Sequence, residues 1–368
     1  MQKQIPFVPG LILAEGFYHD AVKPILASHY PDLRYSAALI GSGSEVLGFD
    51  TEMSRDHHWG PRVLLFLSTD DFKVKWDAIR SVLSNELPPQ YLGYSANFAP
   101  PDPTDHGIQM LRPVISGPVN HRVEIHSFSG FFRGYLNIDI EQALSSVDWL
   151  TLPQQKLRTI IAGRVFHDDL NLESIRSRFA WYPHDVWLYI LAALWARIGQ
   201  EEHLMGRAGD VGDENGSAII GARIARDIMR LAFIIEKQYP PYAKWFGTAF
   251  QQLKCAAMLE PALTEALHAK SWPEREVGLC TAYEIIAGMH NALGITEPVM
   301  AQVSPFFNRP FKIIRGEKFA LAIVQQIKDP GIVPLTQKSL IGSIDIITDN
   351  TDVLEDASLR PMLKVLYQ

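Results

Sequence analysis

A glycine- and serine-containing turn and the acid that follows it are the residues with the clearest chemistry in this chain. Gly43 and Ser44 come after the apolar run 35–40, and Asp56 precedes a second apolar run, 63–67. Glycines let a backbone approach a phosphate closely, and N–H groups at a following helix N-terminus would bind it. An acid at the mouth of the next strand would hold a divalent metal against that phosphate. The spacing therefore predicts phosphoryl chemistry at one edge of a sheet.

A further candidate acid lies in the segment 121–128, where polar and apolar residues alternate. Alternation predicts a half-buried strand, on which Arg122, Glu124 and His126 share one face. Glu124 and His126 would complete a mixed carboxylate and imidazole site, which suits a transition metal better than Mg²⁺. The alternative is a pair of solvated side chains on an exposed strand face.

His58 has several possible roles. It shares a face with Asp56 if the second strand extends back to it. Imidazole is a poor ligand for Mg²⁺ and a good one for Mn²⁺, Zn²⁺ or Fe²⁺. It is also a suitable general base for an acceptor hydroxyl, because its ordinary pKa lies near neutrality. His58 is thus a ligand of a softer or weakly held metal, a general base, or the mark of a site without catalysis.

Taken together, these residues resemble the nucleotidyltransferase fold of the polymerase-beta type. That family pairs a Gly-Ser turn with an Asp-x-Asp motif that opens the next strand. The stretch 41–67 looks like one group within it, a domain of unknown function related to nucleotidyltransferases. The resemblance implies that Gly43 and Ser44 bind a triphosphate and that Asp56 is the first acid of the motif. The second acid is replaced by His58 here.

The resemblance also implies the reaction and its cofactors. Asp56, His58 and Glu124 would form the catalytic and metal-binding set, with Mg²⁺ or Mn²⁺, or a softer metal because of His58. The expected function is metal-dependent transfer of a nucleoside monophosphate from a nucleoside triphosphate to a hydroxyl or amine of a small molecule. The alternative is a catalytically degenerate protein of this fold that binds a nucleotide or small ligand without turnover.

The elements that position these residues follow from the pattern of apolar residues. We expect an α+β fold: a nucleotidyltransferase-like mixed sheet with helices over residues 1–145, then an all-helical substrate-binding domain over residues 146–368. The expected elements are a helix over 11–28 weakened by Pro24, strands at 35–40, 63–67 and 121–128, a helix over 72–83, an irregular or hairpin insertion over 87–121, helices over 154–162, 172–179, 183–206, 217–239, 242–260, 261–269, 275–293 and 316–328, a loop over 206–217, and short helices over 341–367.

Basic residues recur in the helical part of the chain. Arg223, Arg230 and Lys237 are spaced at seven-residue intervals and would share one side of a helix. A solvated basic face is the usual interpretation of such a row, and a phosphate-facing stripe is the functional alternative. Arg223 is therefore a candidate nucleotide-binding residue. Lys244 is a second one, because the segment 239–245 resembles a motif of the same uncharacterised family.

Composition excludes several classes of protein. The net charge of −7 argues against a general nucleic-acid binder, and no apolar run is long enough to cross a membrane. Cys255 and Cys280 lie far apart, without metal-ligand or disulfide spacing, which predicts reduced thiols in a cytoplasmic protein. A small-molecule acceptor is the expected partner, while the acceptor's identity, the nucleotide and the oligomeric state stay open.

Overall fold

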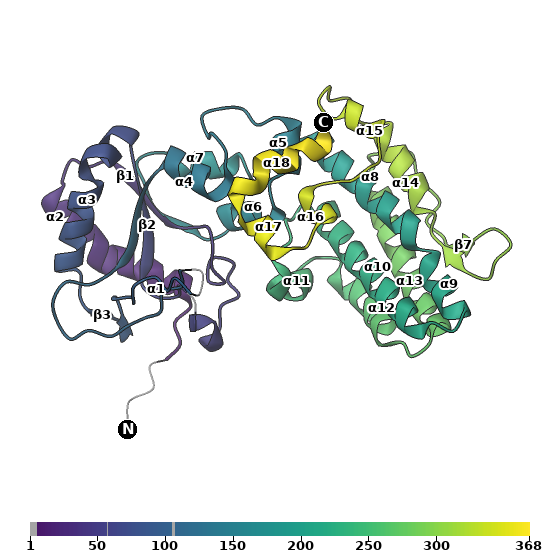
Figure 1. Ribbon diagram of the computed structural model, residues 1–368, viewed down its shortest axis with the longest axis horizontal. Coiled ribbons are helices and arrows are strands. Elements are labelled where there is room, and N and C mark those ends of the chain that lie inside the picture. The colour runs from purple at the N-terminus through teal and green to yellow at the C-terminus, as the bar shows by residue number, and fades with distance from the viewer. Residues whose placement is uncertain (1–5, 57, 105–106) are drawn as a thin grey trace. The chain divides into compact units, whose positions relative to one another are not determined.

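The chain forms an α+β structure with a mixed sheet followed by a helical region, as the sequence predicts (Figure 1). The computed structural model describes residues 6–56, 58–104 and 107–368. Two compact units are present: unit 1 comprises residues 1–143 and 156–180, and unit 2 comprises residues 144–155 and 181–368. The sequence places a single boundary near residue 145. In the structure the chain leaves unit 1 after Ala143 and returns to it from Lys156 to Ala180.

Unit 1 is built on a four-stranded sheet with the order β5-β2-β1-β6. Its strands are β1 (Tyr35–Leu39), β2 (Arg62–Leu67), β5 (Arg122–Ser127) and β6 (Arg164–Asp168). β1 is antiparallel to both β2 and β6, whereas β5 runs parallel to β2. The carboxyl end of β1 therefore lies beside the amino ends of β2 and β5. The first three strands confirm the sequence prediction.

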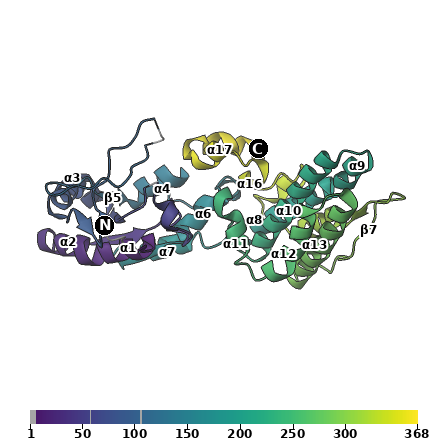
Figure 2. The same cartoon turned by 90° about the horizontal axis from the view of Figure 1, so that it is seen from below.

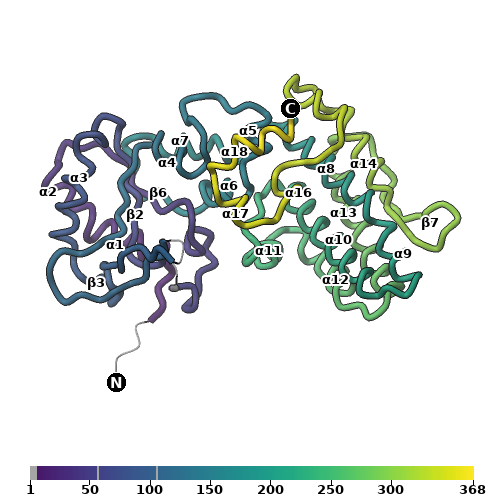
Figure 3. The backbone as a smooth tube through the Cα atoms, viewed as in Figure 1, coloured from purple at the N-terminus to yellow at the C-terminus, as the bar shows by residue number. Residues whose placement is uncertain are grey.

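β6 corrects the prediction that the chain after Ile140 is helical only. This strand pairs with β1 at the edge of the sheet, and its register shifts between Ala37 and Ala38. Figure 3 traces the backbone as it returns to this edge. A five-residue edge strand flanked by helical segments carries too little alternation to be distinguished from a helix turn. Only the pairing with β1 defines it.

Helices cover one face of the sheet. Its apolar side chains, including Ala37, Val63, Leu65 and Val123, pack with residues of α1, α2 and α3 into one buried cluster. Figure 1 shows α1, α2 and α3 together on this side of β1 and β2. The helical elements of this unit are α1 (Gly10–Phe17), the π-helix η1 (Tyr18–Val22), α2 (Lys23–His29), the 3₁₀-helix η2 (Glu52–Asp56), α3 (Thr69–Glu86), α4 (Phe128–Leu136), α6 (Gln154–Ile161, which begins in unit 2) and α7 (Leu172–Ser177).

Pro24 does not end the first helix. The chain stays helical from Gly10 to His29, but the turn just before the proline, η1, is a π-helix. A proline ring clashes with the carbonyl four residues earlier in an α-helix and cannot donate to it. A wider turn at that point accommodates both effects.

The segment 87–121 is an irregular insertion, as predicted. It contains a two-stranded hairpin, β3 (Gln90–Tyr91) with β4 (Tyr94–Ser95), and an isolated bridge between Phe98 and Leu111. A hydrogen bond joins the end of the insertion to its middle: the backbone N–H of Asn120 donates to the Asn97 side chain at 2.7 Å. These contacts fix the course of the insertion as it leads to the start of β5.

Unit 2 is a helical assembly around α8 (His184–Glu201). α8 is buried along most of its length, and it packs against α10 and α14. α8, α10, α12 and α13 lie side by side in Figures 1 and 2. The other elements are α5 (Ser146–Leu150), α9 (Leu204–Asp210), α10 (Glu214–Ile235), α11 (Ala243–Phe250), α12 (Ala256–His268), α13 (Trp272–Ala292), β7 (Ser304–Pro305), β8 (Lys312–Ile313), α14 (Gly316–Val324), α15 (Val333–Thr336), α16 (Ile344–Ile347), α17 (Thr351–Glu355), η3 (Ala357–Leu359), α18 (Arg360–Leu363) and η4 (Lys364–Tyr367).

The loop predicted over residues 206–217 is wrong for most of that range. α9 covers its first part and α10 begins at Glu214, with Asp213 as the N-cap. Its glycines serve helix packing rather than a turn. A Cβ at Gly209 would lie 2.2 Å from the Trp272 ring, and one at Gly206 would lie 2.7 Å from Phe311. None of the helices in the described part of the chain is long and apolar enough to span a membrane.

Candidate functional site

The Gly43–Ser44 turn, His58 and Glu124 lie at the end of the sheet where β1 finishes and where β2 and β5 begin, whereas Arg223 and Lys244 belong to unit 2. The Gly43–Ser44 turn follows β1 after a few residues. Arg62, the first residue of β2, is paired in register with Arg122, the first residue of β5. Three segments that are distant in the sequence therefore meet at one edge.

The turn has a conformation that only glycine adopts easily. Gly43 has a φ of +139°, and a Cβ at this position would lie 2.4 Å from Nη2 of Arg62. Residues 44–48 form a hydrogen-bonded turn, in which the Phe49 N–H donates to the Ser44 carbonyl at 3.0 Å. No helix follows within this stretch, so the expected helix N-terminus is absent from residues 44–50. Any phosphate contact would come from the turn itself.

A buried ion pair holds the turn in place. Arg62 and Glu45 are 8% and 3% exposed, and their charged groups lie 2.8 Å apart. Arg62 also donates to the backbone carbonyl of Ser42. Neither residue belongs to the predicted site. The sequence did contain one indication of this ion pair. Arg62 is a basic residue at the start of an apolar strand, and arginine is rarely buried without a partner.

Asp56 and His58 lie before β2 rather than on it. Asp56 is the last residue of η2, and its side chain lies outside the described residues. His58 has a left-handed backbone, with a φ of +52°. Because β2 starts only at Arg62, strand alternation does not relate His58 to Asp56. Trp59, the next residue, is buried, and its Nε1 donates a hydrogen bond to the Asp50 carboxylate at 2.9 Å.

On β5, Arg122, Glu124 and His126 share a face, as alternation requires. Arg122 donates to Glu124, and Nε2 of His126 lies 3.5 Å from the other carboxylate oxygen. Burial raises the pKa of Glu124, but the hydrogen bond from His126 and the charges of Arg122 and Arg62 outweigh it. The net effect lowers the pKa of Glu124 to about 2. Glu124 is therefore ionised at neutral pH.

Arg122 connects this face to His58. Its Nη1 contacts Nδ1 of His58 and donates to Oε1 of Gln109 at 3.1 Å. The Gln109 backbone N–H also donates to Nδ1 of His58, at 3.4 Å. His58 and Glu124 are thus brought together through one guanidinium. Strand alternation predicts only that Arg122 shares a face with Glu124 and His126, and no sequence pattern relates Gln109 to this face.

The described donors alone do not form a Mg²⁺ site. Among the residues whose side chains the structure describes, no group of three or more His, Cys, Asp or Glu residues could hold a metal. The side chain of Asp56 is not among those described. Glu124 has the charge that a hard cation requires, yet it is bonded to Arg122. A metal at Glu124 would have to compete with this guanidinium.

The basic residues of α10 are matched by acids within unit 2. Arg223 contacts Glu201, Arg226 lies 2.6 Å from Asp349, and Arg230 lies 3.7 Å from Asp227. These pairs fit the interpretation of the row as a paired helix face.

Two lysines lie outside that row. Lys237 follows the end of α10, has a φ of +54°, and places Nζ 4.5 Å from the centroid of the Trp187 ring. It therefore does not continue the row. Lys244 of α11 lies over Trp245, with 4.9 Å between Nζ and the ring centroid.

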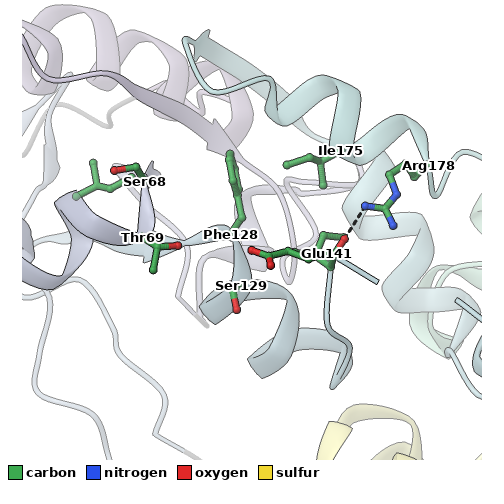
Figure 4. Close-up of a pocket in the computed structure, with 9 residues that line it drawn as sticks. Ser68, Thr69, Phe128, Ser129, Glu141, Ile175 and Arg178 are labelled. Atoms are coloured by element: carbon green, nitrogen blue, oxygen red, sulfur yellow. Dashed lines mark hydrogen bonds between the residues drawn. The ribbon is translucent and has the colours of Figure 1, made fainter. Parts of the chain in front are cut away.

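A pocket of about 180 Å³ lies at the opposite end of the sheet. It is lined by residues that follow β2 and β5, among them Ser68 and Phe128, and by Glu141 and Arg178 (Figure 4). Arg178 donates to the Ile140 carbonyl at 2.7 Å. Since the pocket lies at the carboxyl ends of β2 and β5, it is separate from the residues predicted to do chemistry.

Comparison with known proteins adds a family and a structural likeness. Residues 149–246 match a family described as a domain of unknown function, DUF4037. The chain has no match among functionally curated proteins. Among solved structures it aligns with a nucleotidyltransferase-like protein from Exiguobacterium sibiricum 255-15, at 9% identity and a TM-score of 0.36, covering 94% of this chain and 90% of that one. A likeness at this level assigns no activity, so function has to be inferred from the residues themselves.

Proposed function

We propose that this protein is a nucleotidyltransferase that moves a nucleoside monophosphate from a nucleoside triphosphate to a hydroxyl or amine of a small molecule. The observation that carries the proposal is the meeting of the Gly43–Ser44 turn, His58 and Glu124 at one end of the sheet, linked by Arg62 and Arg122. A triphosphate needs close backbone approach and positive charge, and the acceptor needs an ionised or basic group nearby.

In this proposal the turn and the two arginines bind phosphate oxygens. Arg62 and Arg122 are adjacent in register, and the Nε atom of each is buried without a hydrogen-bond partner among the described residues. Guanidinium groups suit phosphate because their N–H donors match its oxygens. Asp56 with Glu124 would hold Mg²⁺ or Mn²⁺, and the metal would neutralise phosphate charge.

Two residues of the helical unit are further candidates for nucleotide binding. Arg223 and Lys244 are the candidates, the first for its guanidinium and the second for a point charge beside an aromatic ring. The acceptor would be a small molecule rather than a nucleic acid, and the protein would act in the cytoplasm, where its two free cysteines would stay reduced.

One observation favours a second function, binding of a nucleotide without turnover. Arg122 engages both His58 and Glu124, the two described members of the predicted catalytic set. A guanidinium in this position neutralises Glu124 without a metal. The site would then bind a phosphorylated ligand and release no pyrophosphate.

Calorimetry and pyrophosphate release separate these functions. The full chain is titrated with each of the four nucleoside triphosphates in the presence of Mg²⁺ or Mn²⁺. The release of pyrophosphate is then measured with sugars, nucleosides and antibiotics as acceptors. We expect metal-dependent binding and release, both lost in Asp56→Asn. The matched control is Asp70→Asn, an exposed acid of α3 whose substitution should change neither. Binding without release supports the second function, and no binding with any nucleotide overturns both.

Further variants assign the phosphate contacts. Ser44→Ala should weaken triphosphate binding roughly ten- to a hundredfold, because a hydrogen bond to a charged group contributes about 1.5–3 kcal/mol. Arg223→Ala and Lys244→Ala test the helical unit by the same titration. An unchanged dissociation constant in both would remove these two residues from the site.

A further inference from the structure

Arg230 of α10 has an enclosed side chain whose guanidinium donates no hydrogen bond to the described residues. The side chain is 14% exposed, and Nη1 lies 3.7 Å from Oδ1 of Asp227, which is too far for a hydrogen bond. A guanidinium carries five N–H donors, and those of Arg230 meet no acceptor in the part of the chain that the structure describes. Its nitrogens are not among the fully buried unpartnered atoms, so they remain open to solvent. Arg230 therefore presents its donors either to water or to a ligand.

Other enclosed arginines of unit 2 are bonded within the chain. Nη1 of Arg275 donates to Oγ of Ser217 at 2.7 Å, and Nε of Arg360 donates to the Thr151 hydroxyl at 3.1 Å. The side chains of Arg275 and Arg360 are each 5% exposed. Since arginine is rarely enclosed without partners, Arg230 is an exception that calls for an acceptor from outside the chain.

The acids whose charges act on Arg230 are held by other groups. Oδ2 of Asp227 accepts from Nε of Arg197 at 2.6 Å. Asp345 accepts from the backbone N–H of Gln154 at 3.0 Å. Both carboxylates raise the pKa of Arg230 through their charge, but neither accepts a hydrogen bond from it. These two acids therefore do not satisfy the donors of Arg230.

A second arginine, Arg226, lies one turn before Arg230 on the same face of α10, because residues four apart are neighbours on a helix. Nη1 of Arg226 donates to Asp349 at 2.6 Å, while its Nη2 meets no acceptor among the described residues. The Arg226 side chain is 37% exposed. Burial lowers the pKa of Arg230, and the charge of Arg226 lowers it further. Two cations on adjacent turns repel each other, and an anion that contacts both would offset this repulsion.

We infer that Arg226 and Arg230 form a binding site in unit 2 for the phosphate group of a small molecule. A phosphate monoester has nearly two negative charges at neutral pH and three acceptor oxygens, which suit two guanidinium groups at once. A simple carboxylate has a single charge and two oxygens, which match one guanidinium. The inference does not depend on nucleotidyl transfer, because its residues belong to unit 2 and the Gly43–Ser44 turn belongs to unit 1.

Hydrogen exchange of the full chain, measured by mass spectrometry, tests the site with inorganic phosphate as the probe. Phosphate should slow amide exchange in peptides that cover α10 and residues 343–350, because the bound anion holds Arg226 and Arg230 in place. Acetate at the same concentration should not. Slower exchange that is confined to other parts of the chain, or an equal effect of acetate, would overturn the inference. No effect of phosphate on any peptide would leave water as the acceptor of Arg230 and would overturn it as well.

Variants assign the contacts by calorimetry with phosphate. Arg226→Gln and Arg230→Gln should each weaken phosphate binding roughly ten- to a hundredfold, because each removes hydrogen bonds to a charged group. Arg230→Lys keeps the charge but loses the planar fork, so it should retain the fold and still weaken binding. The matched control is Arg207→Gln, an exposed arginine of α9 whose substitution should leave the affinity unchanged. Wild-type affinity in either Arg230 variant, once folded, would contradict the inference.

Two phosphorylated molecules then show what carries the phosphate. ATP and glycerol phosphate are compared by the exchange of α10 peptides in the wild type and in Arg230→Gln. Slower exchange that depends on Arg230 supports the site and identifies its ligand as a nucleotide in the first case and as a simple phosphate ester in the second. An effect of neither would overturn the assignment to a small molecule's phosphate. Because inorganic phosphate probes the site itself, an absence of pyrophosphate release would sink the proposed function and leave this site standing.

Discussion

One glutamate in each unit has a shifted pKa, and the two shifts are opposite in direction. Glu124, in the sheet unit, faces two guanidinium groups, and its pKa is lowered to about 2. Glu202, in the helical unit, accepts backbone N–H bonds from Ile314, Arg315 and Gly316. Burial is the largest influence on Glu202, the nearby charge of Glu317 adds to it, and the pKa rises to about 7.

The arginines at this end of the sheet also differ from the two on the exposed face of α10. Arg62 and Arg122 bind groups that come from distant segments and that include a backbone carbonyl and an imidazole. Arg223 and Arg226 of α10 pair with acids, and the two arginine side chains are 47% and 37% exposed. At the sheet end the charged groups converge from several segments, whereas Arg223 and Arg226 are each matched by one acid, and exposed pairs of that kind contribute little to stability.

The largest expected effect is at the buried ion pair of unit 1. Arg62→Met leaves the Glu45 carboxylate buried without its cation, and should destabilise unit 1 by about 3–5 kcal/mol. Hydrogen exchange measured by mass spectrometry on peptides of β1 and β2 reports this locally. The double variant Arg62→Met, Glu45→Met should recover part of the loss. If the single variant exchanges like wild type, the ion pair does not hold the turn.

Glu202 should make the helical unit more stable in mild acid than at neutral pH. Its folded pKa of about 7 lies above its ordinary value of 4.5. The contribution is therefore fully present below pH 4.5 and is lost as the pH rises through 7, on the order of 3 kcal/mol in total. Urea unfolding of the full chain at several pH values should show this slope. Glu202→Gln should flatten it, and an unchanged slope would exclude Glu202 as its source.

The turn can be tested with a matched pair of glycines. Gly43→Ala places a Cβ against Arg62 and Glu45 at a φ that strains any side chain, and should cost roughly 3 kcal/mol. Gly48 also has a positive φ, +71°, but a Cβ there meets nothing within 4 Å. Gly48→Ala should cost only about 1–2 kcal/mol, the penalty of the left-handed backbone. Thermal unfolding compares them, and equal losses would mean that the contact with Arg62 is unimportant.

The smallest effect is expected on α10. The Arg223 side chain is 47% exposed, and its removal should change the free energy of unfolding by less than about 1 kcal/mol. Urea unfolding of Arg223→Ala measures this. A loss of several kcal/mol would show that Arg223 contributes as much to stability as the buried ion pair of Arg62 and Glu45. The proposed difference between α10 and the sheet end would then be wrong.

Much of the architecture was accessible from local pattern. The runs 35–40, 63–67 and 121–128 predicted strands, and long amphipathic segments predicted most of the helices, because these periods are set by local geometry. β6 and α9 were missed for the same reason, because each depends on residues that are distant in the sequence. The strand is defined by its pairing with β1, and the glycines of α9 are explained by Trp272 and Phe311, which come much later in the chain.

By itself, the sequence determined which residues are available for chemistry: a Gly-Ser turn, an acid, a histidine shortly after it, and a glutamate on an alternating strand. The tertiary structure decided which groups they face. In the sequence, nothing distinguishes Arg62, Arg122 and Gln109 from other polar residues. They meet at the candidate site because β2 and β5 start side by side and because Gln109 of the insertion accepts a hydrogen bond from Arg122. The reason is physical: a hydrogen bond depends on the position and direction of its partner, which residue type and spacing do not specify.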